Sequence, residues 1–451
     1  MSRFRTICTA VMATLLAGTA MAQDLVHKPG PQTTPVLLVG ATVHPVSSEP
    51  IEGGAVYFDD GVIRAVMTAD EAERWRRSPS RPDDLEVQDL TGLHVYPGLV
   101  SGNTVLGLME IGDVDVTNDT NEYGQVTPEA RAVSSVNPDS TLIPVTRRAG
   151  ILTAGVLPSG GAVPGRAAVI RLEGWTWEDM AIKPDAGLVV SWPNLRVSTA
   201  WWVSRTPEEQ REQAQENRRR IIDLFDAAEA YFDARAADPA GTRIDTRYEA
   251  LRPSLSGAAP VFVRAQELEQ IMDAVTVCSS YGMRVVIVGG RDAEQCAEHL
   301  KAHDAAVMIT GTHRMPRRAD SPYDDAFTLP ARLEAAGVRW SLATGGGVFQ
   351  TPHERSLPHH AATAVAYGLD HAAGLRAITL SAAEVLGVGR YVGSIEPGKL
   401  ASVIVTDGDP LEITTNVLGA YISGRSVDLS SKQTELYEKY RKKYQQLGII
   451  D

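Results

Sequence analysis

The sequence predicts an α/β protein whose central part is built on a parallel sheet. Between residues 96 and 389, apolar runs of strand length alternate with helical patterns, which is the order of strand–helix–strand units. The runs at 260–265 and 284–290 are apolar almost throughout, as expected for strands covered on both faces. Short strand-like runs before residue 96 predict a small β-sandwich that begins near the N-terminus.

The first 22 residues have the pattern of a secretory signal peptide. Arg3 and Arg5 supply a positive start, residues 7–16 are apolar, and Ala20-Met21-Ala22 offers the small residues of a cleavage site. We therefore expect cleavage after Ala22 and export of the mature chain, to a bacterial periplasm.

The overall charge and hydropathy exclude two classes of partner. The formal net charge is −13, and removal of the two arginines of the leader would make it −15. Because nucleic-acid binding requires Lys and Arg to neutralise phosphates, such an acidic chain is not expected to bind DNA or RNA. Beyond the leader, no apolar run is long enough to span a bilayer.

The N-terminal part reads as a set of short strands. Residues 36–39, 53–58 and 62–66 are β-type runs, and Asp59-Asp60-Gly61 between the last two is a hairpin signal. The central part continues with strands predicted at 150–157, 167–172, 260–265, 284–290, 305–311 and 338–345.

Helices are predicted from capping patterns. Thr206-Pro207-Glu208-Glu209 is a capping box with proline at the first helical position, and it opens a long charged helix to about Ala237. Ser381 is predicted to cap a later helix. The tail, 431–447, reads as a polar helix with one apolar stripe of Leu436, Tyr437, Tyr440 and Tyr444.

Two stretches resemble the amidohydrolase superfamily. Residues 96–105, Tyr-Pro-Gly-Leu-Val-Ser-Gly-Asn-Thr-Val, resemble the phrase P-G-L-[IV]-D-x-H-x-H at the start of the family's barrel. Residues 392–411 resemble its ending, G-S-[IL]-E-x-G-K-x-A-D-[LV]-V-V followed by D-G-D-P, with Ser402 at the usual Asp. The resemblance is greatest to the imidazolonepropionase-related group.

The resemblance implies a specific architecture and activity. It implies a (β/α)8 barrel of the TIM type over 96–389 and a composite β-sandwich built from residues 23–95 and 390–430. The pattern of the tail adds a C-terminal helix over 431–451. It also implies hydrolysis of non-peptide carbon–nitrogen bonds, in cyclic amides or related compounds.

Members of this family bind zinc or another divalent metal at the barrel mouth, where the strands end. The positions at which the resemblance implies ligands hold Asn103 and Val105 after strand one, Arg264 on strand five and Gly345 after strand eight. Valine and glycine side chains have no donor atom, a neutral amide is a poor zinc ligand, and a guanidinium repels a cation. We therefore predict no metal cofactor.

Other residues near the predicted strand ends are weaker candidates. His313 follows the strand at 305–311 and could point into the pocket, or it is an ordinary loop residue. Asp113 and Asp115 begin an acidic run that lacks the spacing of a calcium loop. Cys278 and Cys296 are either two buried thiols or a disulfide, and the sequence leaves both readings open.

Two functional hypotheses follow. In the first, the chain is an exported non-catalytic or partner subunit that kept the fold, and it assembles as a homo-oligomer or with a metal-loaded amidohydrolase relative. In the second, it is an active hydrolase with a rewired site, metal-free or with a single metal, that uses His313 and the acidic run. No catalytic residue is assigned by the sequence.

Overall fold

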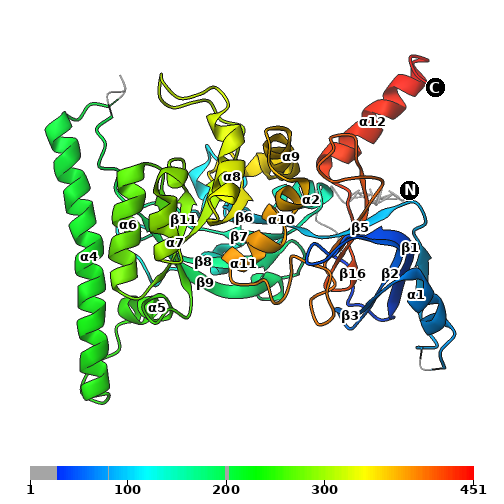
Figure 1. Ribbon diagram of the computed structural model, residues 1–451, viewed down its shortest axis with the longest axis horizontal. Coiled ribbons are helices and arrows are strands. Elements are labelled where there is room, and N and C mark those ends of the chain that lie inside the picture. Colours follow the sequence, from blue (N-terminus) through cyan, green and yellow to red (C-terminus); the bar gives the residue numbers. More distant parts are fainter. Residues whose placement is uncertain (1–27, 80, 199–202) are drawn as a thin grey trace, which may run out of the picture.

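The computed structural model describes residues 28–79, 81–198 and 203–451. Two sheets, each of eight strands, form the molecule, and helices surround the second of them (Figure 1). The leader predicted at 1–22 lies outside the described residues. Within the described part, no helix is both long and apolar enough to cross a membrane.

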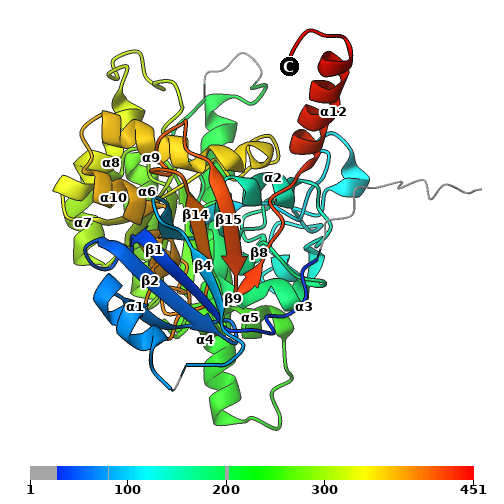
Figure 2. The ribbon, with the colours of Figure 1, turned by 90° about the vertical axis from the view of Figure 1, so that its right-hand side faces the viewer.

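The first sheet joins strands from the two ends of the chain. Its order is β16-β15-β14-β5-β1-β2-β3, and β4 pairs with β1. The strands are β1 (Val36–Val43), β2 (Ile51–Asp59), β3 (Val62–Met67), β4 (Glu86–Asp89), β5 (His94–Pro97), β14 (Val403–Thr406), β15 (Val417–Ile422) and β16 (Arg425–Ser426). β5 and β14 pair antiparallel, so the composite strand-rich unit is confirmed (Figure 2).

The predicted hairpin between β2 and β3 is present. Asp60 and Gly61 both have positive φ, 50° and 74°, which is the backbone that a tight turn of the Asp-Gly type requires. The two strands pair antiparallel on either side of the turn.

The second sheet curves into a nearly closed barrel in the order β13-β12-β11-β10-β9-β8-β7-β6. Its strands are β6 (Leu99–Thr104), β7 (Ile151–Val156), β8 (Gly165–Arg171), β9 (Ala181–Ser191), β10 (Pro260–Ala265), β11 (Arg284–Gly289), β12 (Ala306–Thr310) and β13 (Arg339–Ala343). The predicted fold class, a TIM-like barrel with a second strand-rich unit, is confirmed.

One strand departs from the parallel pattern. β8 runs antiparallel to both β7 and β9, whereas the other pairs in this sheet are parallel. The chain between β7 and β8 is a short loop with Gly160 and Gly161 at positive φ. Such a loop can join antiparallel neighbours, but a parallel pair needs a longer crossover.

The helices of the described part are α1 (Ala69–Arg76), α2 (Leu142–Arg148), α3 (Trp177–Met180), α4 (Pro207–Ala237), α5 (Thr246–Leu255), α6 (Leu268–Ser280), α7 (Ala297–Ala302), α8 (Asp325–Ala335), α9 (Leu357–Ala366), α10 (His371–Ala377), α11 (Leu380–Val385) and α12 (Lys432–Gln446). Most of them surround the barrel, and the long α4 lies at the edge farthest from the first sheet (Figure 1). By contrast, α1 packs on the first sheet and α12 projects away from the body.

One predicted cap is confirmed and another is wrong. At α4, Thr206 and Glu209 form the predicted capping box, with reciprocal hydrogen bonds of 3.2 and 2.8 Å. Ser381 does not cap α11, because α11 begins at Leu380 and Ser381 lies within its first turn. The Thr379 hydroxyl stands at the N-cap position but donates to the Leu375 carbonyl, 2.7 Å away.

The barrel interior is filled by alternate residues of the strands. Val100, Phe262, Val288, Met308 and Ala343 belong to one buried cluster, while their strand neighbours pack against the helices in another. Because side chains alternate along a strand, Arg264, two residues after Phe262, faces the same side as the interior cluster.

The two cysteines of the described part are free and buried. Burial raises the pKa of the Cys278 thiol to about 12 and that of Cys296 to about 11. Of the two readings that the sequence left open, the structure therefore selects buried thiols.

Candidate functional site at the barrel mouth

Asn103 and the loop that contains Gly345 lie together. Asn103 is buried near the end of β6, and its Nδ2 donates to the Thr344 carbonyl, 3.4 Å away. A Cβ placed on Gly346 would lie 2.0 Å from Asn103 Nδ2, so there is no room for a side chain between the loop backbone and the Asn103 amide. Asn103 Oδ1 has no hydrogen-bond partner among the described residues. The two predicted positions, 103 and 345, are therefore neighbours across the gap between β6 and β13.

Val105 has a packing role. Its side chain is buried in the cluster shared with the helices, and its backbone N–H lies 3.4 Å from Thr351 Oγ1. The aliphatic Val105 side chain therefore stabilises the fold through burial, and it has no atom that could bind a metal.

Arg264 places a cation in the mouth. Its Nη1 donates to the Pro158 carbonyl at 2.8 Å and its Nη2 to the Leu157 carbonyl at 3.3 Å, so the side chain reaches from β10 to the end of β7. Among the described residues, no carboxylate forms an ion pair with it. Burial lowers its pKa to about 10, which still leaves the guanidinium charged at neutral pH.

Glu354 is the residue that sequence reasoning missed. It lies in the 3₁₀ segment Thr351–Ser356, is fully buried, and accepts hydrogen bonds from Ser101 Oγ at 2.6 Å and Thr344 Oγ1 at 2.5 Å. Burial raises its pKa to about 7, and the hydroxyl donors oppose this shift only in part. The sequence offered little signal, because one acidic residue beside His353 looks like any loop residue.

His313 does not join the acidic run. Its Nε2 lies 2.8 Å from Thr363 Oγ1, and its ring lies 4.0 Å from that of His360. The Thr312 N–H donates to His360 Nδ1, and burial together with His313 lowers the pKa of His360 to about 4. Burial also lowers the pKa of His313, so burial disfavours the charged form of both rings, and each ring is engaged locally.

Asp113 and Asp115 are exposed in the loop after β6. Across the described residues, no group of three or more His, Cys, Asp or Glu side chains could hold a metal ion. Since zinc sites need at least three protein ligands of these types, the side chains in the described part do not fit a divalent metal at the mouth.

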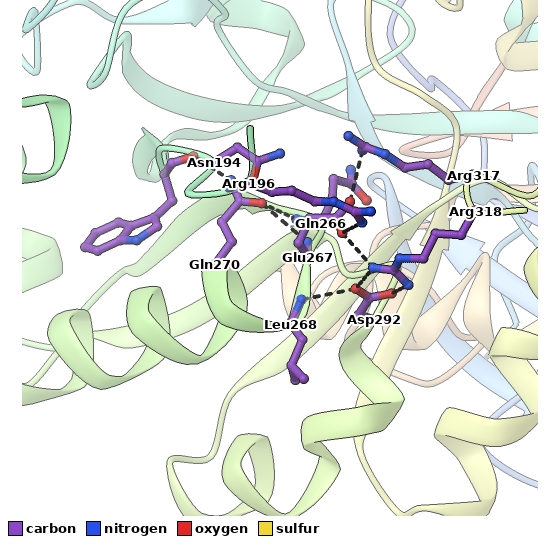
Figure 3. A network of polar contacts seen from close by, with 10 residues as sticks. Asn194, Arg196, Gln266, Glu267, Leu268, Gln270, Asp292, Arg317 and Arg318 are labelled. Carbon is purple, nitrogen blue, oxygen red and sulfur yellow. Dashed lines mark hydrogen bonds and ion pairs between the residues drawn. The ribbon is translucent and has the colours of Figure 1, made fainter. Parts of the chain in front are cut away.

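A charged network follows the ends of β10 and β11 (Figure 3). The Arg318 guanidinium donates to both Asp292 oxygens, at 3.0 and 2.5 Å, and to Glu267 Oε2 at 2.6 Å. Arg317 lies 3.0 Å from Glu267 Oε1, and Arg196 contacts the same carboxylate at 3.4 Å. Both carboxylates are buried, with side chains 7% and 4% exposed, so they need these cations.

A polar pocket of about 390 Å³ lies against this network. Its size is that of a small-molecule site, but charged and amide groups form much of the wall. They include Arg196, Glu267, Gln270, Asp292, Gln295 and Arg318.

We expect Arg318→Ala to lower the free energy of unfolding by about 2–3 kcal/mol, because it removes the bidentate partner of one buried carboxylate and one partner of another. The expected loss lies below that for a fully buried pair, since Arg318 is 29% exposed. Urea denaturation measures it. Arg317→Ala is the matched control and should cost less than about 1 kcal/mol; equal losses would contradict the prediction.

Comparisons with known proteins agree with this architecture. The amidohydrolase family model matches residues 262–427. The amidohydrolase tasK of Hapsidospora irregularis is 24% identical over 371 residues, which are 76% of this chain and 37% of that protein. The imidazolonepropionase of Maricaulis maris (strain MCS10) is 26% identical over 191 residues, 42% of this chain and 45% of that protein.

The chain thus spans less than half the length of either curated relative in the matched regions. A crystal structure of an amidohydrolase from Thermotoga maritima MSB8 superposes with a TM-score of 0.75 at 24% identity, over 87% of this chain and 99% of that one. The family match over residues 262–427 and the curated relatives support membership of the amidohydrolase superfamily, and the Thermotoga maritima structure shows that the fold is shared.

Proposed function

We propose that this chain is an exported, non-catalytic amidohydrolase-superfamily protein that acts as a binding or partner subunit. The observation that carries the proposal is Arg264, which stands where the family resemblance implies a metal-binding histidine. Its charged guanidinium lies in the barrel mouth and is held by two backbone carbonyls of the Leu157-Pro158 segment.

The other marker positions support the same proposal. Asn103 is tied to the Thr344 carbonyl and Val105 is packed in the core. Gly345 supplies no carboxylate to receive a proton from water, and the nearby Glu354 carboxyl is already bonded to two hydroxyls. Metal-assisted hydrolysis depends on ligands that hold the ion, and the residues described at this mouth do not include three that converge on one position.

The proposal also includes where the protein is located and what it binds. Export to a periplasm rests on the leader pattern that ends at Ala22. In this proposal the chain carries no chemistry of its own and binds a partner, which is either a second copy of the chain or a metal-loaded relative. The polar pocket beside Glu267 and Arg318 presents charged and amide groups that could bind a small polar ligand.

We expect the mature chain to retain well below one ion per molecule after incubation with zinc or manganese and desalting. The physical reason is the lack of three convergent ligands among the described residues. Elemental analysis measures the metal content, and assays with cyclic amides and dipeptides measure turnover on the same samples.

The rewired-hydrolase alternative predicts the opposite. Stoichiometric metal that disappears in His313→Ala, or turnover that disappears with it, would overturn the proposed function. Thr363→Ala is the matched control, since it removes the hydroxyl partner of His313 while leaving the imidazole in place.

A further inference from the structure

No residue of the C-terminal helix α12 is buried against the described part of the chain. Ser431 caps the helix, and Figures 1 and 2 show it projecting away from the body. Tyr437, Tyr440, Tyr444 and Leu447 are all exposed large hydrophobic residues. Their spacing of three, four and three places them on one face, as in a helix that packs against a partner.

This helix is also basic within an acidic protein. Four of the eight lysines of the sequence lie in it, and five basic residues against two acidic ones give it a net charge of +3. The rest of the chain therefore carries −16, the difference between −13 and +3. Two copies of α12 would repel each other, so we expect α12 to bind an acidic surface.

The barrel mouth presents a surface of complementary charge and polarity. The loop after β6, residues 110–123 and hereafter the acidic loop, contains no Lys or Arg. Its acidic residues are Glu110, Asp113, Asp115, Asp119 and Glu122, and Val116 and Tyr123 are exposed almost completely, at 91% and 103%. Exposed apolar residues of this size, set among charges of one sign, mark an interaction surface.

The acidic loop is fixed in place, so it can serve as a docking surface without first being ordered. The Thr117 hydroxyl donates to the carbonyls of Ile111 and Val114, at 3.0 and 2.9 Å. Glu110 accepts a hydrogen bond from the Thr141 backbone N–H at 3.1 Å. A preformed surface loses less conformational entropy on binding.

We propose that α12 of one copy docks on the acidic loop of a second copy, and that the exchange is reciprocal. In this dimer the tyrosine face of α12 covers Val116 and Tyr123, and the lysines meet the loop carboxylates. A twofold arrangement uses both surfaces of both copies and leaves none exposed. An anionic membrane is the less suitable partner, because the remaining −16 of the chain would be repelled by it.

The test uses charge reversal on either side of the contact. Wild-type mature protein is expected to sediment as a dimer. The tail variant K439E/K442E/K443E and the loop variant D113K/D115K/D119K are each expected to be monomeric, with the circular dichroism spectrum of the wild type because these side chains are exposed. An equal mixture of the two variants, and a single chain carrying both sets, should restore the dimer, since opposite charges again face each other.

Carbodiimide coupling of lysine amines to carboxylates gives the second readout. We expect intermolecular cross-links from Lys439, Lys442 or Lys443 to the acidic loop, and a dimer that weakens as salt is raised. A monomeric wild type, a dimer unaffected by either variant, or a mixture that stays monomeric would each overturn the proposal. So would a monomer that binds phosphatidylserine vesicles through α12.

Discussion

Arg147→Met is expected to lower the free energy of unfolding by about 3–5 kcal/mol, because it leaves a buried carboxylate without its cation. Arg147 on α2 donates to the Leu172 carbonyl at 3.2 Å and to Glu173 Oε2. The two side chains are 1% and 2% exposed, so water cannot replace the lost partner. Chemical denaturation of the variant and the wild type measures the loss.

The pH dependence of this loss gives an independent check. Burial raises the pKa of Glu173, and without Arg147 the larger of the two opposing cationic contributions is lost, which leaves that of Lys28. A folded-state pKa above the unfolded value makes stability fall as pH rises through it. The deficit of Arg147→Met should therefore be smaller at pH 5 than at pH 8.

The control is the double variant Arg147→Met/Glu173→Leu, which removes both charges. Replacing a buried pair by apolar side chains costs much less than breaking it. An exposed pair, Arg77 with Glu73, serves as the second control, and Arg77→Ala should change stability by less than about 0.5 kcal/mol. If the single and double buried variants lose the same stability, the buried charge is not the cause.

Glu354 is expected to make the protein more stable in mild acid than in mild base. Its pKa is raised by burial from 4.5 to about 7, so the folded state holds a proton that the unfolded chain releases. This contribution is complete below pH 4.5 and disappears as pH rises through 7, a change of about 3 kcal/mol by linkage. Urea denaturation between pH 5 and 8 measures the slope.

Glu354→Gln separates this titration from all others. The amide keeps the shape and a hydrogen-bonding end for Ser101 and Thr344 but cannot ionise, so the variant should lose the slope and exceed the wild type in stability at pH 8. Glu354→Ala should also lose the slope. Its loss of about 2–3 kcal/mol relative to wild type at pH 5, where two buried hydroxyls lose their acceptor, should shrink as the pH rises toward 8. An unchanged slope in Glu354→Gln would show that another group is responsible.

The sequence by itself determined the fold class and the outline of most elements in the later barrel. Apolar runs gave the strands now seen at β10, β11, β12 and β13 to within two residues at either end, because strands buried on both faces leave a continuous pattern. The capping box of α4 gave the start of a helix of 31 residues, because its signals are local. The antiparallel β8 was not predicted, since strand direction depends on how a loop closes.

At the barrel mouth, the sequence determined which residues stand at the marker positions, and the tertiary structure alone decided what they do. The sequence shows that residue 264 is an arginine and not a histidine, but only the folded chain brings the Arg264 guanidinium to the Leu157-Pro158 carbonyls. Likewise Glu354 becomes a buried carboxyl only because Ser101, more than two hundred residues earlier, is folded against it. Burial, pKa and pairing depend on neighbours distant in sequence, whereas propensity, periodicity and capping depend on residues close by.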